Sequence, residues 1–190
     1  MTKKRHSQLT LNQKRIAFDA IDFCVDKFLS RQKREITIKV QGIENLLQKE
    51  NIYADCDYEE NEDGGTPVEF LIRIDNTLDL ETFLRTMMHE LVHMKQWCKG
   101  EMKQLIRGCK TMTYKWHSQK IKLNSVDYYD YPWEIEAHGR EEGLTRQFFA
   151  KNPKWQEIVE NETDVTDTDL QGSKQMVLPL DWSDCAVSRR

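Results

Sequence analysis

The sequence lacks any long apolar run and any apolar core of a signal peptide. No stretch of its 190 residues approaches the roughly 20 apolar residues that a membrane-spanning helix needs. The basic N-terminus, Met1 to Arg5, is followed by polar residues, whereas a signal peptide would continue with an apolar segment. We therefore expect a cytoplasmic protein without a membrane partner.

Closely spaced cysteine pairs are also lacking. The five cysteines are far apart in the chain and form no C-x-x-C pair, at Cys24, Cys56, Cys98, Cys109 and Cys185. This spacing indicates reduced thiols in an intracellular protein and gives no support to cysteine as a zinc ligand.

Charge of one sign is not in large excess, since 28 basic and 32 acidic residues leave a net charge of −4. Taken over the whole chain, this balance neither favours nor excludes nucleic acid as a partner. A hydrophobic content of 38% and a charged content of 32% predict one soluble domain with polar extensions.

What the chain does contain is one H-E-x-x-H motif, His89-Glu90-Leu91-Val92-His93. Apolar residues recur before and within it at the helical spacing i, i+3, i+4, i+7 and i+11, namely Leu80, Phe83, Leu84, Met87 and Leu91. Asp79 can cap this helix, and Lys99 followed by Gly100 can end it. Histidines four residues apart on a helix lie about 40° apart around its axis, so both imidazoles can reach one metal ion.

Glu90 projects beside the same face of the helix, where it can accept a proton from a water activated by zinc. The alternative is that His89 and His93 are ordinary surface or core histidines without a metal. The position of the motif, on an amphipathic helix beside its buried stripe, favours a zinc centre.

A second helix is predicted to begin near Pro132, a residue that suits the first helical position. Its apolar stripe consists of Trp133, Ala137, Leu144 and Phe148. A catalytic zinc needs a third protein ligand and keeps one position open for water. Glu134 lies about 60° from Ala137 around the helix and Glu136 about 100°. The geometry therefore favours Glu134 as the third ligand, with Glu136 as the alternative.

The other patterns predict a compact α+β fold. A helix is expected at residues 11–29, strands are expected at 35–40, 52–58 and 67–74, and a short helix lies between the first two strands. A sheet of three strands, or slightly more, would then pack on the motif helix and on the second ligand-bearing helix. A strand ending beside the metal could also offer an open edge to an extended peptide.

Basic residues dominate positions 99–122, which contain seven lysines and arginines and one acidic residue, Glu101. Tyr114 and Trp116 lie among them. The pattern favours a solvated face, and a nucleic-acid or anion surface along the segment from Lys99 to Lys122 is the alternative. Its secondary structure is predicted as a helix followed by a loop or hairpin.

An H-E-x-x-H motif followed on a later helix by a ligand glutamate resembles the gluzincin metallopeptidases. Glu134-Ile-Glu-Ala137-His138 is similar to the E-x-x-A-D or E-x-x-A-N element of their small intracellular members. The layout of residues 35–149 also resembles SprT-like and ImmA/IrrE-like proteins and metallopeptidase-like proteins encoded by phages. His138 departs from the family's Asp or Asn. SprT-like proteins usually supply a histidine as third ligand, so His117 and His138 stay as outside candidates.

The division of the chain follows from these assignments. We expect a packing helix within residues 1–33, a metallopeptidase-like catalytic core of the minimal zincin kind at 34–155, and a flexible tail at 156–190. The tail is polar and acidic up to residue 174, which predicts disorder, and residues 177–182 are apolar enough to dock on the domain or on another protein.

These features predict a zinc-dependent endopeptidase that acts on proteins or peptides in the cytoplasm, or in the host cytoplasm if a phage encodes it. His89, His93 and Glu134 would hold Zn²⁺ and Glu90 would be the general base. A donor to the developing oxyanion is expected among the neighbours of the motifs, at Tyr128, Tyr129, Tyr131, His117 or His138. The alternative is a zinc-stabilised protein with weak or no catalysis that binds nucleic acid or a protein partner.

Overall fold

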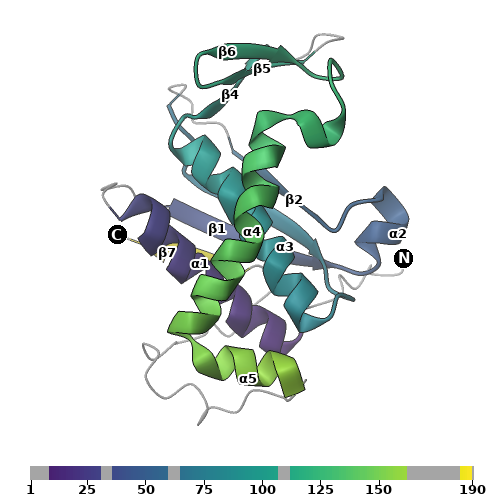
Figure 1. The fold of residues 1–190 in the computed structure, drawn as a ribbon, viewed down its shortest axis with the longest axis vertical. Helices are drawn as coiled ribbons and strands as arrows, with labels where there is room; N and C mark the ends of the chain where they lie inside the picture. The colour runs from purple at the N-terminus through teal and green to yellow at the C-terminus, as the bar shows by residue number, and fades with distance from the viewer. Residues whose placement is uncertain (1–8, 31–35, 60–64, 107–111, 162–184, 190) are drawn as a thin grey trace, which may run out of the picture.

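The computed structural model describes residues 9–30, 36–59, 65–106, 112–161 and 185–189, which form an α+β fold as the sequence predicts (Figure 1). The elements in these ranges are α1 (Leu11–Leu29), β1 (Ile36–Ile43), α2 (Leu46–Glu50), β2 (Ala54–Tyr58), β3 (Glu69–Asp75), α3 (Leu80–Cys98), β4 (Met102–Ile106), β5 (Thr113–Trp116), β6 (Gln119–Lys122), the 3-10 helix η1 (Tyr128–Asp130), α4 (Pro132–Lys151), α5 (Pro153–Asn161) and β7 (Cys185–Arg189).

The larger sheet has the strand order β2-β3-β1-β7, in which β1 and β3 are parallel and the outer strands are antiparallel to their neighbours. Because side chains alternate between the two faces of a strand, one face of β1 and β3 is buried, through Ile36, Ile38, Val40, Phe70, Ile72 and Ile74. This apolar face joins α1 and α3 in a single core. The sheet therefore supports the helix that carries the H-E-x-x-H motif.

Both ends of α3 are fixed by local interactions that the sequence predicts. The Asp79 side chain accepts a hydrogen bond from the Thr82 backbone N–H at 2.9 Å, which caps the first turn. After Lys99, Gly100 adopts φ +65°, and the backbone N–H of Glu101 donates to the Gln96 carbonyl. A glycine suits this left-handed position because it has no Cβ. The motif thus lies in the second half of a 19-residue helix.

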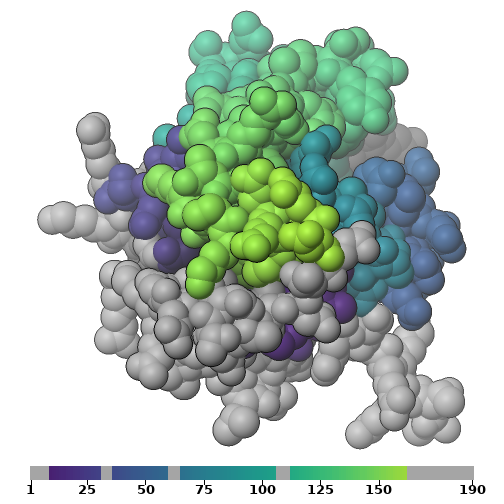
Figure 2. Space-filling model, turned by 60° about the horizontal axis from the view of Figure 1, so that its bottom comes forward, coloured from purple at the N-terminus to yellow at the C-terminus, as the bar shows by residue number. Residues whose placement is uncertain are grey.

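The helix α4 begins with Pro132 at its first turn, as predicted, and packs along α3 (Figure 1). Asn152 caps its C-terminus, and α5 follows and crosses the end of α4 (Figure 1). The indole N–H of Trp155 donates to Asp19 Oδ2 at 2.6 Å, which ties α5 to α1. In Figure 2, which brings this end of the molecule forward, α5 (yellow-green) forms the surface beside the end of α4.

The segment predicted as a helix followed by a loop or hairpin forms a second, antiparallel sheet of order β4-β5-β6, in which β5 and β6 are the predicted hairpin and β4 stands where the helix was expected. The helical prediction was wrong because Gly100 ends α3 and the chain reverses at once. From Met102 the side chains alternate, and the apolar ones cover the aromatic residues Trp97 and Trp133.

The predicted C-terminal tail begins inside α5, and residues 162–184 lie outside the described ranges, so the predictions of disorder and of docking by residues 177–182 are not addressed by the structure. Residues 185–189 form β7, which pairs antiparallel with β1. In the part of the chain that the structure describes, no helix is both long and apolar enough to cross a membrane.

Candidate metal centre

The side chains of His89, His93 and Glu134 converge between α3 and α4. The two histidine Nε2 atoms lie 3.1 Å apart, and each lies 3.4 Å from Glu134 Oε2. All three residues are largely buried, and their ligand atoms form a group that could hold a metal ion. The structure thus brings together the two histidines and the glutamate that the sequence favours as the third ligand.

The spacing of these three atoms fits a zinc ion. Ligands about 2.0 to 2.1 Å from a tetrahedral zinc lie about 3.3 Å from one another, close to the observed 3.1 and 3.4 Å. A direct hydrogen bond between a charged imidazole and a carboxylate is usually shorter, about 2.7 to 2.9 Å. The triangle therefore has the size expected around a shared cation.

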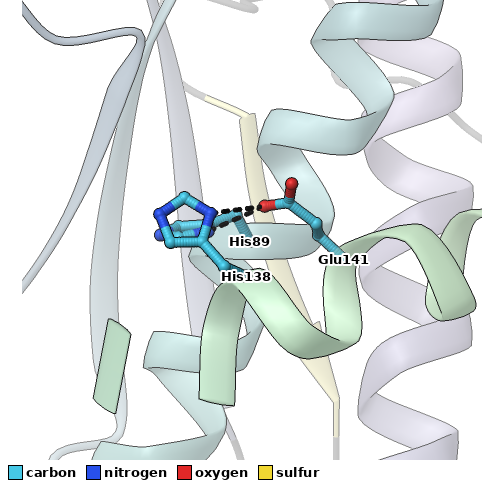
Figure 3. A group of neighbouring side chains, drawn as sticks. All are labelled: His89, His138 and Glu141. Carbon is cyan, nitrogen blue, oxygen red and sulfur yellow. Dashed lines mark hydrogen bonds and ion pairs between the residues drawn. The ribbon is translucent and has the colours of Figure 1, made fainter. Parts of the chain in front are cut away.

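The other nitrogen of His89 is held by Glu141. His89 Nδ1 lies 3.0 Å from Glu141 Oε2, and Figure 3 shows the carboxylate directed at the ring. When Nδ1–H donates to this carboxylate, the Nε2 lone pair is left for a metal. Burial lowers the pKa of His89, but the bonds to Glu134 and Glu141 outweigh it and raise the pKa to about 9. A metal entering the site must therefore displace a proton.

The other nitrogen of His93 is held by Gln96, whose Oε1 lies 2.9 Å from His93 Nδ1. The amide group of the fully buried Gln96 donates to the Trp133 carbonyl at 3.0 Å and to Glu136 Oε2 at 3.1 Å. These bonds fix Gln96 with its oxygen toward the histidine. Each histidine thus has a hydrogen-bond partner that orients its ring.

Glu136, the alternative third ligand, is engaged elsewhere. Its Oε1 lies 2.7 Å from the buried ammonium of Lys95 and 2.8 Å from Arg140 Nε. Burial raises the pKa of Glu136, but its bonds to Lys95 and Gln96 outweigh burial and hold the pKa below its usual range. Its carboxylate therefore neutralises Lys95 and supports the partner of His93, while Glu134 alone faces both histidines.

Glu90, the predicted general base, lies one residue after His89 and is 6% exposed. Among the described residues, no group donates a hydrogen bond to its carboxylate. Burial raises the pKa of Glu90 to about 7, although the two histidines act in the opposite direction. A carboxyl group with a pKa near neutrality is suited to accept and return a proton.

Of the predicted oxyanion donors, Tyr128 lies nearest to the ligands. Its hydroxyl donates to Glu134 Oε2 at 2.8 Å. Burial and the charge of Glu134 raise the pKa of Tyr128, so this phenol keeps its proton. The side chain is half exposed and can therefore also face a bound substrate.

The other predicted donors lie in different surroundings. Tyr131 is buried, stacks on Trp133, and accepts a hydrogen bond from the Asn124 backbone N–H. His117 is an exposed residue in the β5–β6 turn, with φ +49°. Tyr129 is exposed and lies over the ring of His138. These contacts give Tyr131 a structural role and place His117 in a turn of the second sheet.

His138 lies beside the predicted ligands without joining them. Its ring centroid is 4.4 Å from that of His89, and its Nδ1 is 3.3 Å from Glu141 Oε2 (Figure 3). His89, His138 and Glu141 form a second group that could hold a metal ion. A metal in that group would bind Nδ1 of His89, whereas a metal in the first group would bind Nε2.

Two residues that orient the histidines have no assigned role at the sequence level, Glu141 and Gln96. Glu141 follows Glu134 by seven residues, so both lie on one face of α4 two turns apart. Gln96 follows His93 by three residues on α3, which makes them neighbours on that helix. These two spacings are the only features of the sequence that could have indicated Glu141 and Gln96 as partners of the site.

The chain matches no family model, no curated protein and no solved structure in comparisons with known proteins.

Proposed function

We propose that the protein is a zinc-dependent peptidase of the gluzincin kind, in which His89, His93 and Glu134 hold the ion. The observation that carries this proposal is the triangle of Nε2, Nε2 and Oε2 atoms with edges of 3.1, 3.4 and 3.4 Å. Three protein ligands leave a fourth position of a tetrahedral zinc open for water, which is typical of catalytic sites and not of structural ones.

The buried carboxylate of Glu90 supports hydrolysis as the chemistry. Zinc in such a site polarises the substrate carbonyl and lowers the pKa of water to about 7. Glu90 accepts a proton from the attacking water and then passes it to the leaving amine. With its pKa near 7, Glu90 can perform both transfers at neutral pH.

Tyr128 is the residue that we assign to the developing oxyanion. Its phenol holds a proton, lies at the ligand Glu134, and is half exposed. A donor of this kind stabilises the negative charge that forms on the carbonyl oxygen during attack.

The substrate is an extended polypeptide that pairs with the edge strand β2. This strand is the first in the order β2-β3-β1-β7 and packs against α3, the helix that carries the motif. A free strand edge can add a peptide through backbone hydrogen bonds. The polypeptide backbone would then lie beside the metal centre whatever its side chains are.

The experiment that tests this function compares the zinc-loaded protein with its Glu90→Gln variant on an unfolded protein such as casein and on a peptide library. We expect cleavage by the wild type, loss of cleavage on chelation, and recovery with zinc. Glu90→Gln should bind zinc as the wild type does and cleave nothing. Equal cleavage by this variant, or no cleavage of any substrate by the zinc-loaded wild type, would contradict the proposal.

A further inference from the structure

The second sheet carries a row of lysines on one face. In the strand register, Lys103 pairs with Lys115, and Lys115 pairs with Lys120 on its other side. Lys122 lies two residues beyond Lys120 on the same face of β6 and pairs with Thr113. All four ammonium-bearing side chains are exposed. Together these four residues are called the lysine face.

The opposite face of this sheet packs on the domain and fixes the orientation of the lysine face. The ring of Tyr114 lies 5.5 Å from Trp133 and 6.2 Å from Trp97, and Trp116 lies 6.3 Å from Trp133. Because side chains alternate along a strand, Lys115 and its partner Lys120 lie on the face turned away from these rings, while the end of the Lys103 side chain lies close to Gly100. Figure 1 shows this sheet at the end of the molecule where α4 begins.

Folding alone does not account for the lysine face. Like charges directly opposite each other on neighbouring strands are destabilising, and here three lysines stand in one row. Within the described ranges, no acidic group pairs with any of the four. The chain as a whole has a net charge of −4, so the positive field is local to this face.

We propose that the lysine face binds the phosphate backbone of duplex DNA. A row across three strands spans about 10 Å, enough to reach phosphates on both sides of a minor groove about 6 Å wide. The described positions of this face include no aromatic side chain on which the bases of a single strand could stack. Lysines act as point charges on phosphates, so binding depends on salt and not on base sequence.

The test is titration of a labelled duplex DNA of about 20 base pairs with the full chain at about 50 to 200 mM salt. Four phosphate contacts give a slope of log K against log salt of about −3.6, at about 0.9 for each contact. Changing Lys115→Gln together with Lys120→Gln should weaken binding about tenfold or more at the lowest salt and reduce the slope by about 2.

The matched control is Lys49→Gln together with Lys154→Gln, two exposed lysines on α2 and α5. This pair changes the net charge equally and should leave DNA affinity close to that of the wild type. The melting temperature of the Lys115 and Lys120 double variant should equal or exceed that of the wild type, since a like-charge pair is lost. Chelation of zinc should not alter DNA binding, so the result is independent of the proposed peptidase activity.

Several outcomes would overturn the proposal. Equal losses of affinity in the two double variants would show that only net charge matters. Equal or tighter binding of polyglutamate would identify an acidic polypeptide as the partner. Tighter binding of single-stranded DNA or of duplex RNA would exclude duplex DNA as the ligand for which this face is suited.

Discussion

His89 Nδ1 and Glu141 Oε2 lie 3.0 Å apart, and this contact joins the two helices on which the candidate metal centre is built. Glu141 lies on the same face of α4 as Glu134, two turns further along the helix. One helix thus supplies both a carboxylate that could bind a metal ion and a carboxylate that orients His89. Such outer partners fix the tautomer of a ligating histidine and increase its basicity.

Glu141→Gln should lower the affinity for zinc about 10- to 100-fold, because the Nδ1–H of His89 loses its charged acceptor. The measurement is a competition titration with a zinc chelator. Glu142→Gln is the matched control, since Glu142 is the next residue and pairs with Arg85 and Arg146 on the surface. Equal affinity of Glu141→Gln and the wild type would remove Glu141 from the centre.

His138→Ala distinguishes the two groups of ligands that share His89. If His89, His93 and Glu134 hold the ion, His138→Ala keeps one zinc per chain, because His138 contacts the ring of His89 and the carboxylate of Glu141 but is not itself a ligand. Elemental analysis of the purified variant makes the distinction. Loss of the zinc in this variant would assign the ion to the group of His89, His138 and Glu141.

Tyr128→Phe should reduce kcat for peptide hydrolysis about 100- to 1000-fold while zinc stays bound, since the variant lacks a donor for the oxyanion. Steady-state kinetics with zinc-saturated protein provide the measurement, and KM should change little. Tyr129→Phe, which alters the exposed neighbouring ring, should leave kcat unchanged. A Tyr128→Phe variant as active as the wild type would require a different donor.

Asp75 stabilises the connection between β3 and α3. Its Oδ2 accepts a hydrogen bond from the Leu47 N–H at 2.9 Å, and its Oδ1 accepts bonds from the Thr77 N–H at 2.9 Å and the Thr77 hydroxyl at 2.7 Å. Burial raises the pKa of Asp75, but these bonds outweigh it and hold the pKa below its usual value. The charged form is therefore the one that favours folding.

Asp75→Asn should lower the free energy of unfolding at pH 7 by about 1 to 3 kcal/mol, because an amide cannot accept all three bonds. A depressed carboxyl pKa contributes stability that is present above the unfolded pKa of about 3.9 and is lost as the pH falls through the folded pKa. The difference between variant and wild type should accordingly shrink below about pH 4. Urea unfolding at pH 7 and at pH 3 measures the free energy of unfolding of both proteins and hence this difference. A difference that does not depend on pH would contradict this role of the charge.

Sequence patterns within one helix predicted much of the site. His89, Glu90 and His93 lie on a single amphipathic helix, so their spacing in the sequence predicted that the two histidines share one face of it. The preference for Glu134 over Glu136 also followed from angles around one helix axis. The engagement of Glu136 with Lys95 and that of Glu141 with His89 depend on how α3 and α4 cross. Residues 41 and 52 positions apart in the chain give no local signal of such contacts.

The helix predicted at the start of the segment from Lys99 to Lys122 was the main error in the fold, because β4 lies there. The predicted hairpin corresponds to β5 and β6, and side chains alternate along both strands. That alternation places Tyr114 and Trp116 toward the domain and Lys115 and Lys120 away from it. The two properties of the segment, basic and aromatic, therefore belong to opposite faces of one sheet.

The most direct test of the candidate centre is the zinc content of three purified proteins: the wild type, Glu134→Gln and Glu136→Gln. Both substitutions remove one carboxylate from the same helix, two residues apart, and only Glu134 faces the two Nε2 atoms. We predict one zinc per chain in the wild type and in Glu136→Gln, and loss of zinc from Glu134→Gln. A wild type without affinity for zinc, or a Glu134→Gln variant that binds zinc as tightly as the wild type, would contradict this account.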